Sequence, residues 1–340
     1  MAYYLYVSRQ DDDKISIFQM DAASGRLDLQ NEMAVAGGPA AMAVDPQRRF
    51  LYVGCRSIRE ISSFRIDQNS GGLSYAGTAP LEGEPVFLAT DRKGKFVLSA
   101  YYYQAKVAVH PIGEDGVASA PPVEWLTTDS GAHAIQTDPS NRFVFVPHIA
   151  NRGPNAIFQF RFDETSGHLT PSSPPQVSPE DYLGPRHFCF HPRLDILYFS
   201  DEQGCSVTAY RLDTSNGTLT SFQTVSTLPD DYRETNSCSQ IQITPSGKFL
   251  YAPNRGHNSI ASFAVDEESG RLTATGRVST EPVPRAFSLD PQGRFVFAAG
   301  LESGRLASYR VNADTGVLEE LENFTVGNRP MWVLGIELPG

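Results

Sequence analysis

A repeated turn-and-strand segment, present along almost the whole chain, constrains the fold more than any other feature of this sequence. Six segments carry a turn residue, usually Asp followed by Pro, and then a run of aromatic and β-branched residues typical of a hairpin. They begin at Asp45, Asp91, Asp138, His191, Thr244 and Asp290. Successive segments start 46, 47, 53, 53 and 46 residues apart. A period of this length is typical of propellers and other repeat architectures.

A second motif lies between these segments and consists of Asp or Asn, with Gly four residues later and Leu six residues later. It begins at Asp21, Asp67, Asp163, Asp213, Asp266 and Asn312, and a shortened version surrounds Gly116. The glycine can adopt the positive φ that tight hairpins require. Seven outer turns therefore accompany six complete inner turns.

The seventh inner repeat is divided between the two ends of the chain. Residues 329–336 resemble the strand before each inner turn, and residues 4–7 resemble the strand after it. We therefore predict an all-β fold, a seven-bladed β-propeller with four antiparallel strands per blade and a single domain over residues 1–340. The C-terminal strand is expected to join the N-terminal blade, which closes the ring and removes an exposed sheet edge. No helix of consequence is expected.

Composition and charge exclude several classes of function. The formal charge of −11 and the absence of a Lys/Arg run argue against a nucleic-acid partner. No stretch approaches ~18 consecutive apolar residues, and no signal peptide is recognisable, so we expect no membrane association and a cytoplasmic location. Cys55, Cys189, Cys205 and Cys238 show no CxxC spacing and are expected to be reduced thiols. We expect a monomer or a weak dimer.

Alignment of the repeats on the turn residue predicts which side chains meet at one mouth of the central channel. The innermost strand begins five positions before the turn, runs about six residues away from this mouth, and the next strand returns to it. The first position holds Ala40, Val86, His133, Arg186, Ser239, Arg285 and Met331. The position where the second strand ends holds Arg56, Tyr102, Ile149, Glu202, Arg255, Leu301 and Gln10.

Charged residues stand out among the small, apolar and aromatic residues at this mouth. They are Arg56, His133, Arg186, Glu202, Arg255 and Arg285. Four arginines on an acidic protein reverse the local charge, and arginine is suited to bidentate binding of phosphate or carboxylate. The predicted ligand is therefore a small anion, with Tyr102 and His148 as further binding candidates. The two longest connections, residues 171–183 and 227–237, are expected to form walls at this rim.

Some of these residues also have structural explanations. For Glu202 with Arg186 or Arg255, the alternative to a functional role is a structural ion pair. The Asp-Pro turns are expected at the far rim with a structural role only. Five histidines are interpreted as solvated or packing residues: His110, His168, His187, His191 and His257. His187 is expected to point away from Arg186, because side chains alternate along a strand.

Other catalytic signatures are absent from the sequence. It contains no nucleophile elbow, no H-E-x-x-H, no P-loop and no dinucleotide fingerprint. No His/Asp/Glu cluster has metal-ligand spacing, and the arginines would repel a divalent cation. We therefore expect neither a metal nor a cofactor.

Five segments resemble the lactonase family of seven-bladed β-propellers, and the resemblance extends over essentially the whole chain. They are GAH (131–133), LGPRHFCFHP (183–192), YFSDEQ (198–203), FLYAPNR (249–255) and VGNRPMWV (326–333). The resemblance implies metal-independent acid–base hydrolysis of 6-phosphoglucono-δ-lactone to 6-phosphogluconate in the pentose phosphate pathway. It implies functional side chains at His133, Arg186, Glu202 and Arg255, the residues that the repeat alignment also isolates.

Two other functions fit the same rim. One is a lactonase or cycloisomerase for a non-phosphorylated sugar lactone or a muconate-type acid. The other is a propeller without enzymatic activity that serves as an interaction platform, which would show exposed apolar patches at the rim rather than buried charge.

Overall fold

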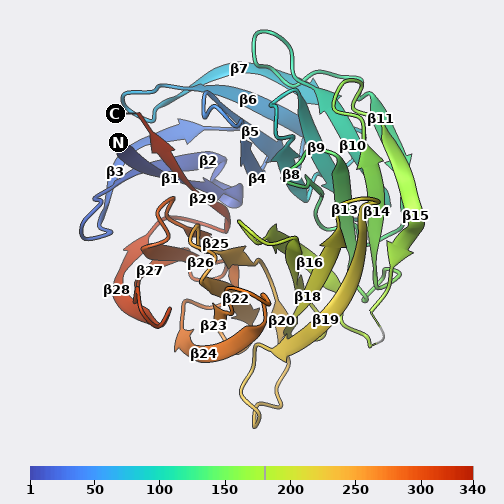
Figure 1. The fold of residues 1–340 in the computed structure, drawn as a ribbon. Coiled ribbons are helices and arrows are strands. Elements are labelled where there is room, and N and C mark those ends of the chain that lie inside the picture. The colour runs from blue at the N-terminus through green and yellow to red at the C-terminus, as the bar shows by residue number, and fades with distance from the viewer. Residues whose placement is uncertain (180, 340) are drawn as a thin grey trace.

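The computed structural model describes residues 1–179 and 181–339 and arranges them as seven antiparallel blades around a central channel (Figure 1). We number the blades in chain order, with both chain ends in blade 1. The innermost strands are β29 (Pro330–Leu338), β4 (Pro39–Val44), β8 (Phe87–Thr90), β12 (Gln136–Thr137), β16 (Pro185–Phe190), β20 (Ser237–Cys238) with β21 (Gln242–Ile243), and β25 (Pro284–Leu289). The seven-bladed propeller predicted from the repeats is confirmed.

The other three strands of each blade follow outward in chain order. The second strands are β1 (Ala2–Arg9), β5 (Phe50–Cys55), β9 (Phe96–Tyr101), β13 (Phe143–His148), β17 (Ile196–Asp201), β22 (Phe249–Arg255) and β26 (Phe295–Gly300). The third strands are β2 (Lys14–Met20), β6 (Glu60–Ile66), β10 (Lys106–Pro111), β14 (Ala156–Phe162), β18 (Ser206–Asp213), β23 (Ser259–Val265) and β27 (Arg305–Val311). The outermost strands are β3 (Leu27–Ala34), β7 (Leu73–Pro80), β11 (Glu124–Thr127), β15 (Leu169–Val177), β19 (Thr218–Ser226), β24 (Leu272–Ser279) and β28 (Leu318–Thr325).

Blade 1 closes the ring as predicted. Strand β29 pairs antiparallel with β1, with Leu5 opposite Gly335 and Tyr6 opposite Leu334. Figure 1 shows the two chain ends side by side, with β29 in red next to β1 in blue. A 3-10 turn, η1 (Gln10–Asp12), follows β1. Within the described ranges, no helix has the length and apolar character needed to cross a membrane.

The repeated Asp of the inner turn caps the turn that joins the two inner strands of a blade. Oδ1 of Asp45 accepts hydrogen bonds from the backbone N–H groups of Arg49 and Phe50, both at 2.6 Å. Asp91, Asp138 and Asp290 repeat this pattern in their own blades. The carboxylate satisfies two turn donors that would otherwise lack a partner, which explains why the turn recurs in the sequence.

Buried tyrosines connect neighbouring blades. The hydroxyl of Tyr6 in blade 1 donates to the carbonyl of Gly71 in the outer turn of blade 2, at 2.7 Å. Three further pairs do the same between other neighbours: Tyr52 with Gly116, Tyr198 with Gly270, and Tyr251 with Gly316. The inner hairpin of one blade is thus joined to the outer turn of the next.

Two predicted details are wrong. The innermost strands are not uniformly about six residues long: β12 has two residues, and the inner strand of blade 6 is broken into β20 and β21. In these short inner strands, side-chain amides form hydrogen bonds to the neighbouring blade. For example, Gln136 Nε2 in β12 donates to the carbonyl of Phe188 at 3.1 Å. The connection predicted over residues 171–183 begins later, because β15 continues to Val177. Prolines are tolerated there because β15 is an edge strand.

Candidate functional site

Register shifts in the innermost strands place the candidate side chains at one mouth of the channel. The pairing of β16 with β17 shifts around Arg186, and that of β25 with β26 shifts around Arg285. Strands β4 and β29 show similar irregularities near Ala40 and Met331. A bulge adds one residue to one strand and re-aims its side chain. In four of the seven blades, the position identified from the repeats is therefore a bulged residue.

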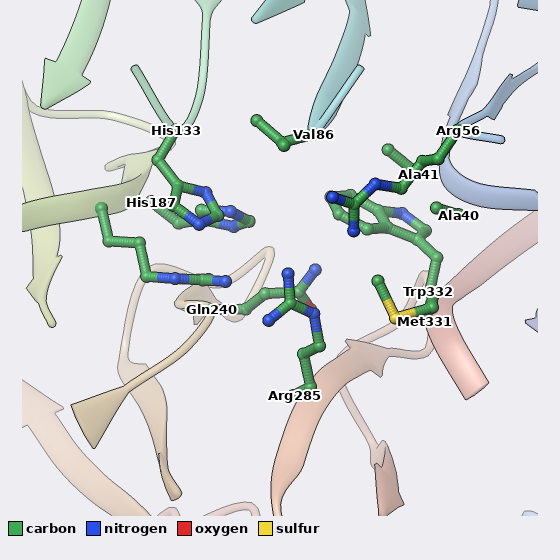
Figure 2. Close-up of a pocket in the computed structure, with 11 residues that line it drawn as sticks. Ala40, Ala41, Arg56, Val86, His133, His187, Gln240, Arg285, Met331 and Trp332 are labelled. Atoms are coloured by element: carbon green, nitrogen blue, oxygen red, sulfur yellow. The ribbon is translucent and has the colours of Figure 1, made fainter. Parts of the chain in front are cut away.

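A pocket at this mouth brings four of the predicted residues together: Arg56, His133, Arg186 and Arg285. His187, Gln240 and Trp332 also line it. Figure 2 shows His133 and His187 on one side, Arg56 and Trp332 on the other, and Arg285 reaching in from a third side. We call this space the mouth pocket.

Glu202 lies between two arginines at the edge of the mouth pocket. Its Oε2 is 2.6 Å from Arg186 Nε and 3.2 Å from Arg255 Nη2. The angle at Arg186 Nε does not satisfy a hydrogen bond, so this contact is an ion pair by distance alone. Arg255 Nη2 also donates to the carbonyl of Cys238 at 2.7 Å. One carboxylate thus serves two guanidinium groups, which leaves the site with excess positive charge.

Burial and mutual repulsion determine the protonation of these groups. Burial, followed by the charge of Arg186, lowers the pKa of His133 well below its ordinary value. The pKa of Arg285 falls to about 10, first through burial and then through repulsion from Arg255 and Arg56. At neutral pH, His133 is therefore uncharged, whereas Arg285 remains a cation.

Five buried side-chain nitrogens of residues that line the mouth pocket have no hydrogen-bond partner among the described residues. They are Nε of Arg56, Nδ1 of His133, Nε and Nη1 of Arg186, and Nε2 of His187. Arg186 is only 1% exposed. Buried polar atoms in proteins are almost always paired, and such a cluster of unpaired atoms is typical of a site that binds a polar ligand.

Tyr102 and Arg56 lie at the margin of this arrangement. The ring of Tyr102 packs edge-on against His133, with 5.9 Å between centroids, and its hydroxyl donates to the carbonyl of Asn151 at 3.3 Å. Arg56 Nη2 is 3.1 Å from Glu84 Oε2, so part of its charge is already compensated.

The structure does not bring His148 to the mouth pocket. The imidazole is fully buried, with Nδ1 at 3.0 Å from the carbonyl of Val146 and Nε2 at 2.9 Å from Thr128 Oγ1. Its ring packs against Phe158, with 4.5 Å between centroids. His148 therefore lies apart from the predicted site residues that meet at the mouth pocket, with both ring nitrogens already paired inside the blade.

The prediction that His187 points away from the site is wrong. His187 lines the mouth pocket beside Arg186, because the bulge at Arg186 interrupts the alternation on which the prediction depended. Gln240 and Trp332 were missed as well. The Arg-His dipeptide was the only signal in the sequence that could have identified His187.

Metal-binding groups are not evident in the described part of the chain. There, no group of three or more His, Cys, Asp or Glu side chains is arranged to hold a metal ion. The side chains that converge at the mouth pocket are arginines and histidines, a set suited to an anion.

Comparison with known proteins places this geometry in a family. The family described as "Lactonase, 7-bladed beta-propeller" matches residues 2–88 and 76–335. The chain belongs to this lactonase family. It is 36% identical over 333 residues to the 6-phosphogluconolactonase of Pectobacterium carotovorum subsp. carotovorum (strain PC1), covering 98% of each chain. It is 34% identical over 337 residues to the 6-phosphogluconolactonase of Enterobacter sp. (strain 638), covering 98% of this chain and 99% of that one.

Solved structures show the same lactonase fold. The periplasmic gluconolactonase PpgL of Pseudomonas aeruginosa matches with a TM-score of 0.91 at 24% identity and covers 100% of both chains. A protein from Lactobacillus plantarum matches with a TM-score of 0.88 at 24% identity, covering 99% of this chain and 100% of that one. The resemblance seen in the sequence is thus confirmed at the level of family and fold.

Proposed function

We propose that this member of the lactonase family hydrolyses 6-phosphoglucono-δ-lactone to 6-phosphogluconate, a step of the pentose phosphate pathway. The observation that carries the proposal is the mouth pocket, in which three arginines and an uncharged His133 meet. The two full-length relatives named 6-phosphogluconolactonase support this choice of substrate.

The reaction transfers an acyl group from an ester to water. It requires a base for the water, positive charge for the oxyanion, and an acid for the ring oxygen that leaves. His133 takes a proton from the attacking water and returns one to the ring oxygen. Arg186 stabilises the oxyanion, with Arg255 beside it, and Glu202 holds both guanidinium groups at this edge of the pocket.

Arg285, assisted by Arg56, is assigned to the phosphate. Among the described residues, no carboxylate lies within ion-pair distance of Arg285, whereas Arg56 is paired with Glu84. A buried guanidinium without an acidic partner is available to bind an anion. Figure 2 shows Arg285 reaching into the pocket from a different side than His133, so phosphate and reacting carbonyl have separate positions.

The test compares hydrolysis of 6-phosphoglucono-δ-lactone and glucono-δ-lactone in the presence of EDTA, each corrected for its spontaneous rate. For His133→Ala we expect kcat to fall roughly 10²- to 10⁴-fold with little change in KM, because the base is lost. For Arg285→Ala we expect KM to rise for the phosphorylated lactone only, whereas Arg285→Lys retains part of the affinity. Equal losses on both lactones in Arg285→Ala would refute the phosphate assignment.

A further inference from the structure

A second hollow of about 320 Å³ lies along the same inner strands, beyond the mouth pocket. Its polar lining includes Arg92, Gln136, Cys189 and Gln242. Since β16 starts at the mouth and passes Cys189 further along, this hollow lies on the far side of the pocket's floor. Arg92 is exposed, so the hollow reaches the molecular surface. We call it the lower hollow.

Three residues line both spaces: His187, Gln240 and Trp332. Together with Phe87, which lines the lower hollow, they form the floor between the two spaces. The rings of His187, Phe87 and Trp332 pack edge-on or tilted against one another. Centroid distances are 5.1 Å for His187 with Phe87, 5.6 Å for Phe87 with Trp332, and 6.0 Å for His187 with Trp332. Of the three residues that face both spaces, only histidine has two ring nitrogens, so that it can accept a proton on one and release it from the other.

His187 also lies next to the proposed base. The ring centroids of His133 and His187 are 5.2 Å apart, and each ring has one buried nitrogen without a partner among the described residues. At this separation one bridging water molecule can connect the two rings. The charged groups that face His187 are Arg186, Arg285 and Arg255, which together with burial lower its pKa, so that its ring is uncharged at neutral pH and holds a proton only in passing.

Lactone hydrolysis leaves one proton to be removed in each turnover. The oxygen of water bonds to the carbonyl carbon, and the bond from that carbon to the ring oxygen breaks. One proton of the water ends on the ring oxygen, and the product is a carboxylate at neutral pH. The other proton stays on the new carboxyl group until His133, which has by then given its first proton to the ring oxygen, accepts it and so leaves the product as the carboxylate.

We propose that His187 receives this second proton from His133 and releases it into the lower hollow, separately from the mouth through which the substrate enters. This inference rests on the proposed lactone hydrolysis. The volume and polar lining of the lower hollow suit several water molecules, each of which occupies about 30 Å³ in the liquid. His187 is thus a proton-relay residue that acts through His133, and its neighbours Phe87 and Trp332 supply only packing.

The test measures proton release in a pH-stat with 6-phosphoglucono-δ-lactone at low and high imidazole concentration, corrected for the enzyme-free rate at each concentration. For His187→Ala we expect kcat at low imidazole to fall roughly tenfold or more, with KM nearly unchanged, and to recover as imidazole enters the vacated space. The wild-type rate should not depend on imidazole. His187→Phe, which keeps a ring in the floor, should show the loss without the recovery.

Phe87→Leu is the matched control, because it disturbs the same ring packing without removing a titratable group. It should leave the rate insensitive to imidazole. If His187→Ala does not fold, His187→Gln takes its place in the pH-stat. Wild-type kcat in the His187 variants, or a loss in His187→Ala that imidazole does not restore, overturns the relay alone. A wild-type protein without activity on this lactone overturns the proposed function, and the relay with it.

Discussion

At the scale of single residues, burial rather than unusual residue type gives the site its chemistry. His133 and His187 are uncharged because they lie among arginines in a space closed to solvent on most sides. His148 has the same residue type and similar burial, but both of its nitrogens are paired inside the blade. Sequence alone could not separate these cases, because hydrogen-bond partners depend on the packed structure.

His148 makes the stability of the protein depend on pH. Burial lowers its pKa from 6.5 to about 4. The unfolded chain therefore binds more protons between these values, and stability falls as the pH decreases from 6.5 towards 4, by up to about 3 kcal/mol for this residue. For His148→Gln we expect lower stability than wild type at pH 7, but a smaller difference at pH 4.5. Urea unfolding at the two pH values measures this, and a constant difference would contradict it.

At the scale of strands and turns, the repeats made the fold predictable from the sequence. The positions of the β-bulges could not be predicted. A turn residue at a fixed position, Asp in four of the six complete repeats, marks each inner turn, so alignment on that position identified Arg186 and Arg285 whatever the local pairing. The bulge that brings His187 to the same pocket depends on strand register, and a shift of one residue moves a side chain to the other face. Bulges leave no mark in one sequence, which is why His187 and Gln240 were missed.

The inner turn of blade 7 allows a test of how much one capping carboxylate contributes to the free energy of unfolding. Asp290 is 2% exposed, and its Oδ1 accepts hydrogen bonds from the backbone N–H groups of Arg294 and Phe295 at 2.5 and 2.7 Å. For Asp290→Ala we expect a loss of about 2–4 kcal/mol in the free energy of unfolding. KM should not change, because this turn lies at the far end of β25 from Arg285.

Asp290→Asn is the matched variant for this turn, since its side-chain oxygen can still accept both hydrogen bonds. It should retain most of the stability in urea unfolding. A loss in Asp290→Asn as large as in Asp290→Ala would show that capping is not the cause, and a raised KM would show that the far rim affects the site.

At the scale of the whole molecule, the ring depends on a seam where the two chain ends meet. Strand β29 pairs with β1 and packs between β25 and β4, so it joins blade 7 to blade 2. It also carries Met331 and Trp332 into the mouth pocket. Closure of the ring and assembly of the site are therefore the same structural event.

Gly335 tests how closely this seam is packed. Its N–H donates to Ser288 Oγ at 3.0 Å, and a Cβ at this position would lie 2.9 Å from the carbonyl oxygen of Leu289 in β25. A backbone oxygen cannot turn aside as a flexible side chain can, so Gly335→Ala should push β29 away from β25. We expect a loss of about 1–3 kcal/mol in the free energy of unfolding, typical of overpacking.

The control is Gly276→Ala in the outer strand β24, where a Cβ would meet nothing within 4 Å. Both changes remove the same backbone freedom from the unfolded chain, so they differ only in the space around the new methyl group. Gly276→Ala should be neutral or stabilising by up to about 1 kcal/mol. Urea unfolding of Gly335→Ala and Gly276→Ala, measured side by side, tests the prediction. Equal midpoints would mean that β29 can move away from β25 at no cost in stability, and that ring closure does not depend on close packing at β29.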